Sequence, residues 1–385
     1  MCVATRFPPI LGCFFMTDSI TATLEALRAQ RHTGIEDGCS LPPASYHSPD
    51  VYAVEIERVF QREWVCLGHV DEIDEPGDYF TTDLVGEPIM VLRDASGNII
   101  ALSNVCRHRC AQLLEGQGNI SQIVCPYHGW TYSLDGVLRG ASHMERSRAF
   151  EPTDYRLPAI CVELWNGYIF VNLDGEATAL APRLEPLERL IEPFHIDEMR
   201  YFFGGEYVWD ANWKVITENF TENYHTYKVH PESLNRMNPT RLTKMLGQSE
   251  DFHVHIEPYA EDREPLPGPY HPDVPESERN HVYLFALFPS ATYGAHARRT
   301  FSFFIYPLGP ERSRVKWGLA TRAEMTQTER EEVVEVYGSI IQEDRKIVER
   351  LQAALSSRHA GRGRLSHLEQ STWDLYRYLG KQLLG

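Results

Sequence analysis

The sequence lacks any apolar run of the ~18 residues that a membrane-spanning helix needs. It also lacks a basic stripe, and its formal net charge is −17, with 37 Lys and Arg against 54 Asp and Glu. Nucleic acid and anionic membrane surfaces are therefore unfavourable partners. The acidity mildly favours a cationic small molecule, although many enzymes are acidic for solubility alone. The sequence has no internal repeat.

A secretory signal is missing as well, because the apolar stretch at residues 8–16 is short and holds two prolines. Met16 is a second candidate start beside Met1, with residues 1–15 as an extension or an arm. The chain has eight cysteines, but its size and the missing signal argue against a disulfide framework. Three of the eight lie within residues 106–125 among histidines, which indicates a metal site in a reducing cytoplasm.

The chain is long enough for two domains, and an apolar fraction of 43% supplies their cores. Residues 19–30 predict a short helix, and β-type runs fill residues 66–173. Two of these runs flank residues 95–98 and predict a hairpin. Residues 175–186 are rich in Ala, Pro and charge and are predicted to form a linker.

A second set of elements follows this linker. A helix is expected over residues 212–228, and residues 257–279 predict a long loop or lid because they are dense in proline, glycine and charge. A long helix opens at Thr326 with the capping-box spacing to Glu329. The strands expected here cover residues 201–209, 282–288, 300–307 and 314–321. We therefore predict three parts, which are an arm with a helix (1–45), a β-rich domain (46–173) and an α+β domain (188–385).

Two mixed pairs of metal ligands stand in the β-rich domain, Cys106-Arg-His108 and Cys125-Pro-Tyr-His128. Two thiolates and two imidazoles can hold a tetrahedral zinc ion, or a [2Fe–2S] cluster in which histidines replace two of the cysteines. Zinc sites usually keep like ligands together, whereas each pair here joins one Cys to one His. Each loop can then give a thiolate to one iron and an imidazole to the other, which favours the cluster.

Two further histidines, His225 and His230, are five residues apart in the α+β domain. On an unbroken helix this spacing places two side chains ~140° apart, so they could share a metal only if the helix ended between them. Pro231 supplies a reason, because the residue before a proline avoids helical geometry. We expect His225 near a helix end and His230 on the following turn. Surface or core histidines are the alternative.

The long C-terminal helix offers a carboxylate to these histidines. Asp344 falls in the gap of an apolar stripe, where it is costly unless it meets a cation or metal, or is satisfied by arginine or backbone donors. Its neighbour Glu343 is expected to point elsewhere as an ordinary solvated acid. Two histidines and one carboxylate leave positions open on iron for O₂, as in non-haem Fe(II) oxygenases. The stripe comprises Val333, Tyr337, Ile340, Ile347, Leu351 and Leu355.

These motifs resemble the oxygenase (alpha) subunit of the Rieske non-haem iron oxygenases. Residues 104–109 and 125–132 are similar to the family's Rieske motif, and residues 218–231 and 342–352 to its catalytic motifs. The resemblance covers roughly residues 45–380. It implies an N-terminal all-β Rieske [2Fe–2S] domain and an α+β catalytic domain, whose antiparallel sheet wraps around a long helix in the helix-grip manner.

The resemblance also implies the ligands of both centres. The cluster ligands would be Cys106, His108, Cys125 and His128, and the ligands of a mononuclear Fe(II) would be His225, His230 and Asp344. Cys110 departs from the family, where a small residue such as glycine is common at this place. We expect Cys110 to be a small buried filler, since the four-ligand set is already complete.

Glu222 is implied to be an electron bridge from a cluster histidine of one subunit to an iron histidine of the next. It precedes His225 by three residues, so both are expected on one helical face. Glu218 on the same face is a competitor, and either acid could instead be solvated. The resemblance further implies a cytoplasmic homotrimer that receives electrons from an NAD(P)H-dependent flavin and iron–sulfur reductase.

The aromatic residues of the central strands suggest a substrate pocket. A cage of rings suits a quaternary ammonium group by cation–π attraction, but it suits a flat aromatic ring equally, and such residues are often plain core. The candidates are Tyr293, Phe301 and Phe303. Arg298 and Arg299 could hold a substrate carboxylate, although a solvated pair at a strand end is the simpler interpretation.

The overall sequence resembles the choline, carnitine and glycine betaine monooxygenase branch of this family. The predicted function is therefore O₂-dependent hydroxylation or N-demethylation of a small quaternary ammonium compound. Hydroxylation of an aromatic acid is the alternative within the enzymes. A Rieske electron carrier without oxygenase activity is a more remote one, because it leaves the C-terminal half and Asp344 unexplained.

Overall fold

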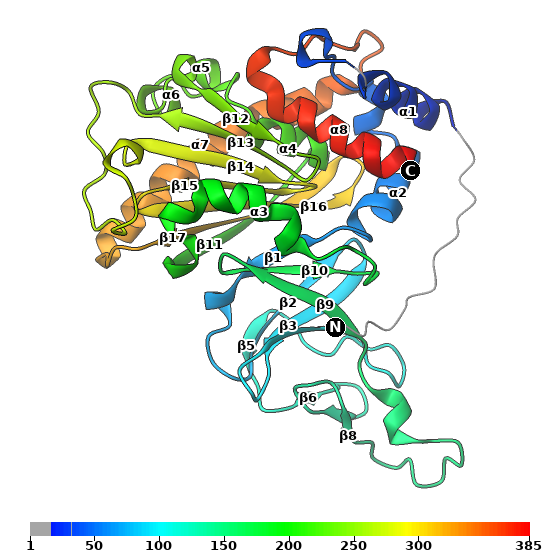
Figure 1. The fold of residues 1–385 in the computed structure, drawn as a ribbon. Coiled ribbons are helices and arrows are strands. Elements are labelled where there is room, and N and C mark those ends of the chain that lie inside the picture. The colour runs from blue at the N-terminus through cyan, green and yellow to red at the C-terminus, as the bar shows by residue number, and fades with distance from the viewer. Residues whose placement is uncertain (1–16, 32) are drawn as a thin grey trace. The chain divides into compact units, whose positions relative to one another are not determined.

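The computed structural model describes residues 17–31 and 33–385, whose path is drawn in Figure 1. The candidate start at Met16 and the arm before it lie outside these residues. Contacts divide the described chain into two units, one of residues 61–180 and one of residues 17–60 together with 181–385. Neither described unit holds a helix that is long and apolar enough to cross a membrane.

The first unit is built from antiparallel strands. These are β1 (Val65–His69), β2 (Asp78–Leu84), β3 (Glu87–Arg93), β4 (Ile99–Ser103), β5 (Gln117–Asn119), β6 (Ile123–Val124), β7 (Thr131–Tyr132), β8 (Leu138–Gly140), β9 (Ala159–Trp165) and β10 (Tyr168–Asn172). Seven pair in the order β1-β10-β9-β4-β3-β2-β5, and three in the order β6-β7-β8. Strands β3 and β4 form the predicted hairpin. Asp94 Oδ1 accepts the N–H of Ser96 and of Asn98 there, which fixes the reversal of the chain.

The second unit contains a curved antiparallel sheet and the longest helices (Figure 1). Its strands are β11 (Arg200–Trp209), β12 (Lys244–Gln248), β13 (Phe252–Pro258), β14 (His281–Leu287), β15 (Ala291–His296), β16 (Arg299–Gly309) and β17 (Arg312–Thr321), in the order β11-β17-β16-β15-β14-β13-β12. Its helices are α1 (Asp18–Gln30), α2 (Pro49–Glu55), α3 (Leu180–Ile191), α4 (Trp213–Thr221), α5 (Thr226–Val229), α6 (Leu234–Met237), α7 (Gln327–Leu355) and α8 (Gln370–Leu384). Helix α4 packs on β14, β15 and β16, and α7 packs on α4 and β11. The α+β fold class predicted from the sequence is confirmed.

Helix α7 places the candidate ligand Asp344 in the interior. The predicted capping box forms, because Thr326 and Glu329 bond to each other's backbone N–H groups. Asp344 is buried at 4% exposure, one turn after the buried Ile340. The second half of the predicted apolar stripe, which began at Ile347 and Leu351, is wrong by one residue. Val348 and Gln352 are buried instead, and Leu351 is exposed. A stripe at steps of four, rather than a mixture of three and four, therefore faces the core.

Helix α2 packs with the second unit, although the sequence analysis placed it in the β-rich domain. The reason is a buried ion pair between Glu55 Oε1 and Lys214 Nζ at 2.7 Å, which ties α2 to α4. Glu55 Oε2 also accepts the indole N–H of Trp213 at 2.8 Å. Long-range pairing of this kind has no signature in the local sequence.

Two segments differ from the elements expected of them. Residues 180–191 form helix α3, so part of the predicted linker at 175–186 is helical. The helix expected over residues 212–228 is broken, because α4 ends at Thr221 and α5 begins at Thr226. This break is what turns the following histidines toward α7.

Candidate functional site

The two Cys/His pairs lie on twin loops of the first unit. In each loop a buried cysteine donates its backbone N–H, at 2.8 Å, to a carbonyl five residues further along. Each loop then turns at a left-handed residue, Cys110 (φ 56°) or Gly129 (φ 72°). The N–H of that residue returns to the carbonyl of Cys106 or Cys125 at 3.0 Å. The same turn is thus used twice to present one thiol and one imidazole.

The four predicted cluster ligands meet between these loops. The rings of His108 and His128 lie 4.6 Å apart, and the Cys106 thiol interacts with that of Cys125. His108 Nδ1 is buried without a hydrogen-bond partner among the described residues. A buried nitrogen of this kind is costly unless a metal takes its lone pair. The residues therefore fit a [2Fe–2S] cluster held by two cysteines on one iron and two histidines on the other.

Neighbouring aromatic groups fix the cluster loops. Trp130 stacks on His108, with ring centroids 4.7 Å apart and an interplanar angle of 7°. Tyr132 Oη accepts the N–H of Arg107 at 3.2 Å and lies 3.4 Å from Cys106 Sγ, so its own proton can point at the sulfur. Burial raises the pKa of the Cys106 thiol. Hydrogen bonds to cluster sulfurs tune the reduction potential, and Tyr132 is placed to supply one.

The expectation that Cys110 is a buried filler is wrong. Its side chain is exposed, and its left-handed backbone makes it the counterpart of Gly129 in the other loop. Glycine adopts this conformation without steric cost, whereas a cysteine does not. What residue 110 must do is adopt the left-handed turn of the loop, and it does not fill the core.

The three predicted iron ligands meet beside helix α5. His225 caps the beginning of α5 and His230 its end, and this short helix holds their ring centroids 5.3 Å apart. Asp344 Oδ1 lies 2.8 Å from His230 Nε2 and 3.3 Å from His225 Nε2. All three ligand atoms lie within 4.8 Å of one another. Two imidazoles and one carboxylate so arranged fit a mononuclear iron with positions left open.

The electrostatics of these ligands are strongly coupled. Burial lowers the pKa of His225, but the carboxylates of Glu222 and Asp344 outweigh burial and raise it to about 10. Burial raises the pKa of Asp344, but the hydrogen bonds from His225 and His230 outweigh it and lower the pKa to about 2. Before metal binds, the His225 imidazole therefore carries a proton that the metal must displace, so metal binding weakens as the pH falls.

Each of the two predicted iron-ligand histidines donates the N–H of its other ring nitrogen to a carboxylate. Glu222 Oε1 lies 2.7 Å from His225 Nδ1, and Glu343 Oε2 lies 2.6 Å from His230 Nδ1. Such outer partners fix the tautomer and the ring orientation of a metal ligand. The expectation that Glu343 is a solvated acid is wrong. The His230 ring lies between the carboxylates of Glu343 and Asp344 and contacts one of them with each of its two nitrogens.

Two more side chains complete this outer ring. Asn219 Nδ2 donates to Asp344 Oδ1 at 3.0 Å, and Ser233 Oγ donates to Glu343 Oε2 at 2.7 Å. Sequence reasoning missed both roles. Residue 219 did fall within a motif of the family, and this was the only signal for it.

Glu222 reaches His225 by a different route from the one expected. Helix α4 ends at Thr221 and Glu222 has an extended backbone (φ −116°), so the two residues do not share a helical face. The carboxylate instead folds back over the turn, where Oε2 accepts the backbone N–H groups of Tyr224 and His225. The competitor, Glu218, accepts a hydrogen bond from Tyr46 at 2.9 Å, and burial raises its pKa to about 8.

The outer carboxylate Glu343 leads to a direct prediction. Glu343→Ala should weaken iron retention at the mononuclear site by about 10- to 100-fold, because His230 loses the partner that orients its ring. Iron content would be measured after dialysis against a graded series of chelator concentrations. The exposed Glu331→Ala on the same helix is the matched control. Equal iron retention in both variants would show that Glu343 does not position His230.

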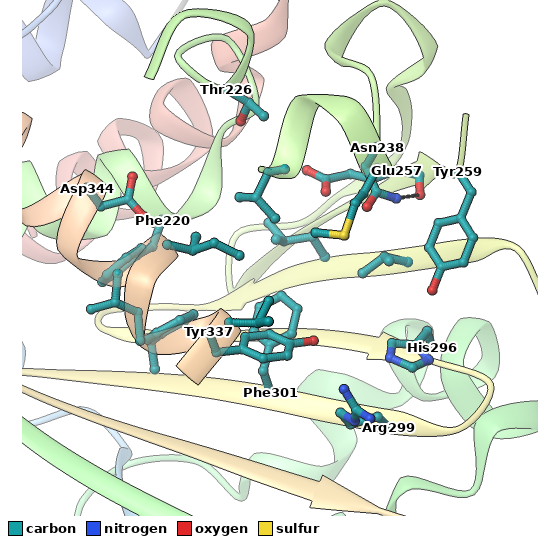
Figure 2. Close-up of a pocket in the computed structure, with 18 of the residues that line it drawn as sticks. Phe220, Thr226, Asn238, Glu257, Tyr259, His296, Arg299, Phe301, Tyr337 and Asp344 are labelled. Carbon is teal, nitrogen blue, oxygen red and sulfur yellow. Dashed lines mark hydrogen bonds between the residues drawn. The ribbon is translucent and has the colours of Figure 1, made fainter. Parts of the chain in front are cut away.

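A cavity of about 360 Å³ in the second unit opens next to these ligands. Its wall includes His225 and Asp344 and, near them, the aromatic rings of Phe220, Phe301, Phe303 and Tyr337. Phe220 stacks on Phe303 with centroids 4.3 Å apart, and Phe301 packs on Tyr337 with centroids 5.4 Å apart. Figure 2 shows Asp344 and Phe220 toward one end, with Tyr337 and Phe301 next along the wall.

The predicted pocket residues divide between the two faces of the sheet. Phe301 and Phe303 line the cavity, but Tyr293 does not, so its assignment to the pocket is wrong. Tyr293 pairs with Ser302 in the sheet and stacks on Phe285 with centroids 5.1 Å apart, on the opposite face. Side chains alternate along a strand, so residue 302 and its cross-strand partner face away from residues 301 and 303.

The other end of the cavity is polar. Glu257, Tyr259, His296 and Arg299 line it, and the last two lie at this end in Figure 2. Arg299 is buried, contrary to the expectation of a solvated pair, while its neighbour Arg298 donates to Pro267 O at 3.0 Å. Burial and the charges of Arg299 and Arg298 lower the pKa of His296 to about 3, so its ring is neutral at physiological pH.

Two family models match the chain. Residues 63–152 match the Rieske [2Fe-2S] domain, and residues 196–385 match the catalytic domain of the ring hydroxylating alpha subunit. These ranges contain the twin Cys/His loops and the His225, His230 and Asp344 cluster respectively.

Curated relatives include monooxygenases of glycine betaine, carnitine and choline. The glycine betaine monooxygenase oxygenase subunit of Chromohalobacter salexigens is 36% identical over 51% of this chain and 44% of its own length. The carnitine monooxygenase oxygenase subunit of Acinetobacter pittii is 29% identical over 85% of this chain and 88% of its own length. The chloroplastic choline monooxygenase of Amaranthus tricolor is 30% identical over 58% and 53%. The matched segment thus spans about half the length of two of these relatives.

Solved structures share the fold. A quaternary ammonium Rieske monooxygenase of carnitine oxidation has a TM-score of 0.81 at 24% identity, over 91% of this chain and 96% of that chain. Naphthalene 1,2-dioxygenase from Rhodococcus sp. has a TM-score of 0.79 at 22% identity, over 96% and 99%. The TM-scores of the quaternary ammonium monooxygenase and of the aromatic dioxygenase are almost equal, so the fold alone does not indicate the substrate class.

Proposed function

This chain belongs to the Rieske non-haem iron oxygenases, and we propose that it oxidises an N-methyl group of a small quaternary ammonium compound. The observation that carries this proposal is the aromatic cavity that ends at the candidate iron ligands. The faces of Phe220, Phe301 and Tyr337 can hold a trimethylammonium group by cation–π attraction. The glycine betaine, carnitine and choline monooxygenases among its relatives act on compounds of this class.

The reaction balances with one reduced nicotinamide. A mononuclear iron at His225, His230 and Asp344 would supply the activation of O₂, using electrons that pass through the [2Fe–2S] cluster. One oxygen atom enters a C–H bond of the methyl group and the other leaves as water. NAD(P)H supplies two electrons and one of the two protons of this water, and solvent supplies the second proton. The N-hydroxymethyl product then breaks its C–N bond and releases formaldehyde, a proton and the tertiary amine.

The protein's own residues position the reacting groups. Glu222 and Glu343 fix the rings of the two histidines, and Asn219 fixes the carboxylate of Asp344. The apolar middle of the cavity excludes water from the methyl group. Expulsion of water strengthens every electrostatic contact inside the site.

We also propose that electrons cross from one subunit to the next through Glu222. The two cluster loops carry the exposed Arg107, Arg109 and His128, whereas Glu222 and Glu343 make the iron site acidic. Basic loops and an acidic site favour docking in the correct orientation. We accordingly propose a homotrimer in the cytoplasm, supplied by an NAD(P)H-dependent flavin and iron–sulfur reductase.

Substrate charge provides the test of the quaternary ammonium proposal. The purified enzyme should bind glycine betaine more tightly than its neutral isostere 3,3-dimethylbutyrate, by about 5- to 30-fold for each well-placed ring. Calorimetric titration measures both affinities, and formaldehyde release with a reductase identifies the substrate. An aromatic carboxylic acid serves as the competing candidate. Equal affinity for the isosteres together with turnover of the aromatic acid would refute the proposal.

A further inference from the structure

Arg299 is a buried cation at the end of the substrate cavity away from the iron ligands (Figure 2). It is 8% exposed, and its Nε has no hydrogen-bond partner among the described residues. Its guanidinium bonds to the Tyr337 hydroxyl, but no ion pair of the described residues includes it. Burial of an unpaired charge costs several kcal/mol in a protein interior. A cation kept at this cost beside a cavity is a binding group for an anion.

The groups around Arg299 leave it available to a ligand. His296, its cross-strand partner in the β15–β16 hairpin, is neutral and does not compete for an anion. Glu257 also lines this end, but its Oε1 lies 3.2 Å from His255 Nε2 and it forms no ion pair with Arg299. Tyr337 occupies one donor of the guanidinium and so helps to fix its plane. The planar fork of an arginine matches the two oxygens of a carboxylate.

The two ends of the cavity therefore differ in charge preference. The iron end offers aromatic faces, which suit a cation, whereas the far end offers Arg299. Apolar side chains also line the cavity, among them Met237, Leu284 and Ile340. A ligand that satisfies both ends must be bipolar, with its charges separated by a short chain.

We propose that Arg299 binds the carboxylate of the substrate and thereby selects carboxylated quaternary amines over choline-type alcohols. The cationic half of this inference rests on the proposed function, whereas the anionic half stands on Arg299 alone. The substrate lies with its carboxylate on Arg299 and one N-methyl group toward His225 and Asp344. Arg299 acts in specificity and takes no part in the chemical step.

Four ligands that combine the presence or absence of each charge test the cationic and the anionic half of the inference separately. Glycine betaine carries both charges, choline only the cation, 3,3-dimethylbutyrate only the anion, and 3,3-dimethylbutanol neither. Dissociation constants are measured by calorimetry on the full-length holoenzyme and on Arg299→Gln, Arg299→Lys and Arg298→Gln. Arg298 is the matched control, because it precedes Arg299 in the same hairpin but does not line the cavity. The cluster spectrum reports whether the first unit of each variant is folded, and the iron content of the mononuclear site reports the same for the second unit.

The unaltered enzyme should bind each carboxylate about 10- to 100-fold more tightly than the matching alcohol, the range expected for a hydrogen bond to a charged group. Arg299→Gln should abolish this advantage for both pairs, Arg299→Lys should keep part of it, and Arg298→Gln should keep all of it. A carboxylate advantage that survives Arg299→Gln overturns the assignment. Equal binding of betaine and dimethylbutyrate, with the carboxylate advantage intact, would instead refute the quaternary ammonium proposal and leave Arg299 standing.

Discussion

Replacing Asp344 by alanine should remove the mononuclear iron and abolish oxygenation while the [2Fe–2S] spectrum stays unchanged. Among the residues that the structure describes, Asp344 is the one carboxylate that reaches both histidines, at 2.8 and 3.3 Å. The iron content should fall from about three to about two atoms per chain, the two that remain belonging to the cluster. Activity should drop by more than about 100-fold, because loss of even an outer partner costs about 10- to 100-fold.

A control on the same helix separates ligation from damage to α7. Glu335→Ala alters an exposed acid of α7 and should leave the iron content and the activity as they are. The cluster belongs to the first unit, so its visible absorption reports independently that this unit is folded and loaded. A third iron atom and full turnover in Asp344→Ala would assign the metal to other residues.

The candidate ligands could be predicted because their signals are local. The mixed Cys/His pairs stand on short loops, so the spacing within each pair already states which side chains meet. His225 and His230 can share a metal if the helix ends between them, and Pro231 predicted this end because the residue before a proline avoids helical geometry. Asp344 was visible as an acid on a core-facing stripe, which costs free energy unless a cation meets it. Each inference used a few neighbouring residues and one physical rule.

The residues that were misjudged depend on contacts between distant segments. Glu343 meets His230, which is 113 positions away in the sequence, and helix periodicity alone turns residue 343 toward water. Tyr293 was placed on the wrong face because β15 was not predicted, so its register with β16 was unknown. Arg299 gave no sign of burial in the sequence, since only the assembled cavity shows that it is enclosed and that its Nε has no hydrogen-bond partner among the described residues. Local sequence patterns therefore predict the candidate ligands, but they do not predict the groups that orient those ligands.

Mixing two inactive variants should restore activity if electrons pass between subunits. Cys106→Ala removes a thiolate of the cluster but leaves the iron ligands, whereas Asp344→Ala removes an iron ligand but leaves the cluster. Each variant alone should be inactive. In a ring in which every cluster serves the next subunit, random reassembly of equal amounts should restore about one quarter of the activity, because one interface in four joins an intact cluster to an intact iron site.

The magnitude of this recovery discriminates between the two routes for electrons. If each chain used its own cluster, no mixed oligomer would contain a complete pathway, and the mixture would stay as inactive as its components. Dissociation and reassembly must precede the assay, and mixing without them is the control. A third mixture, in which the Cys106→Ala partner also carries Glu222→Gln, should lose the recovered activity while it keeps its iron, because every functional interface then lacks the charge beside His225. Full recovery in that mixture would remove Glu222 from the pathway and leave it the single role of holding the His225 ring.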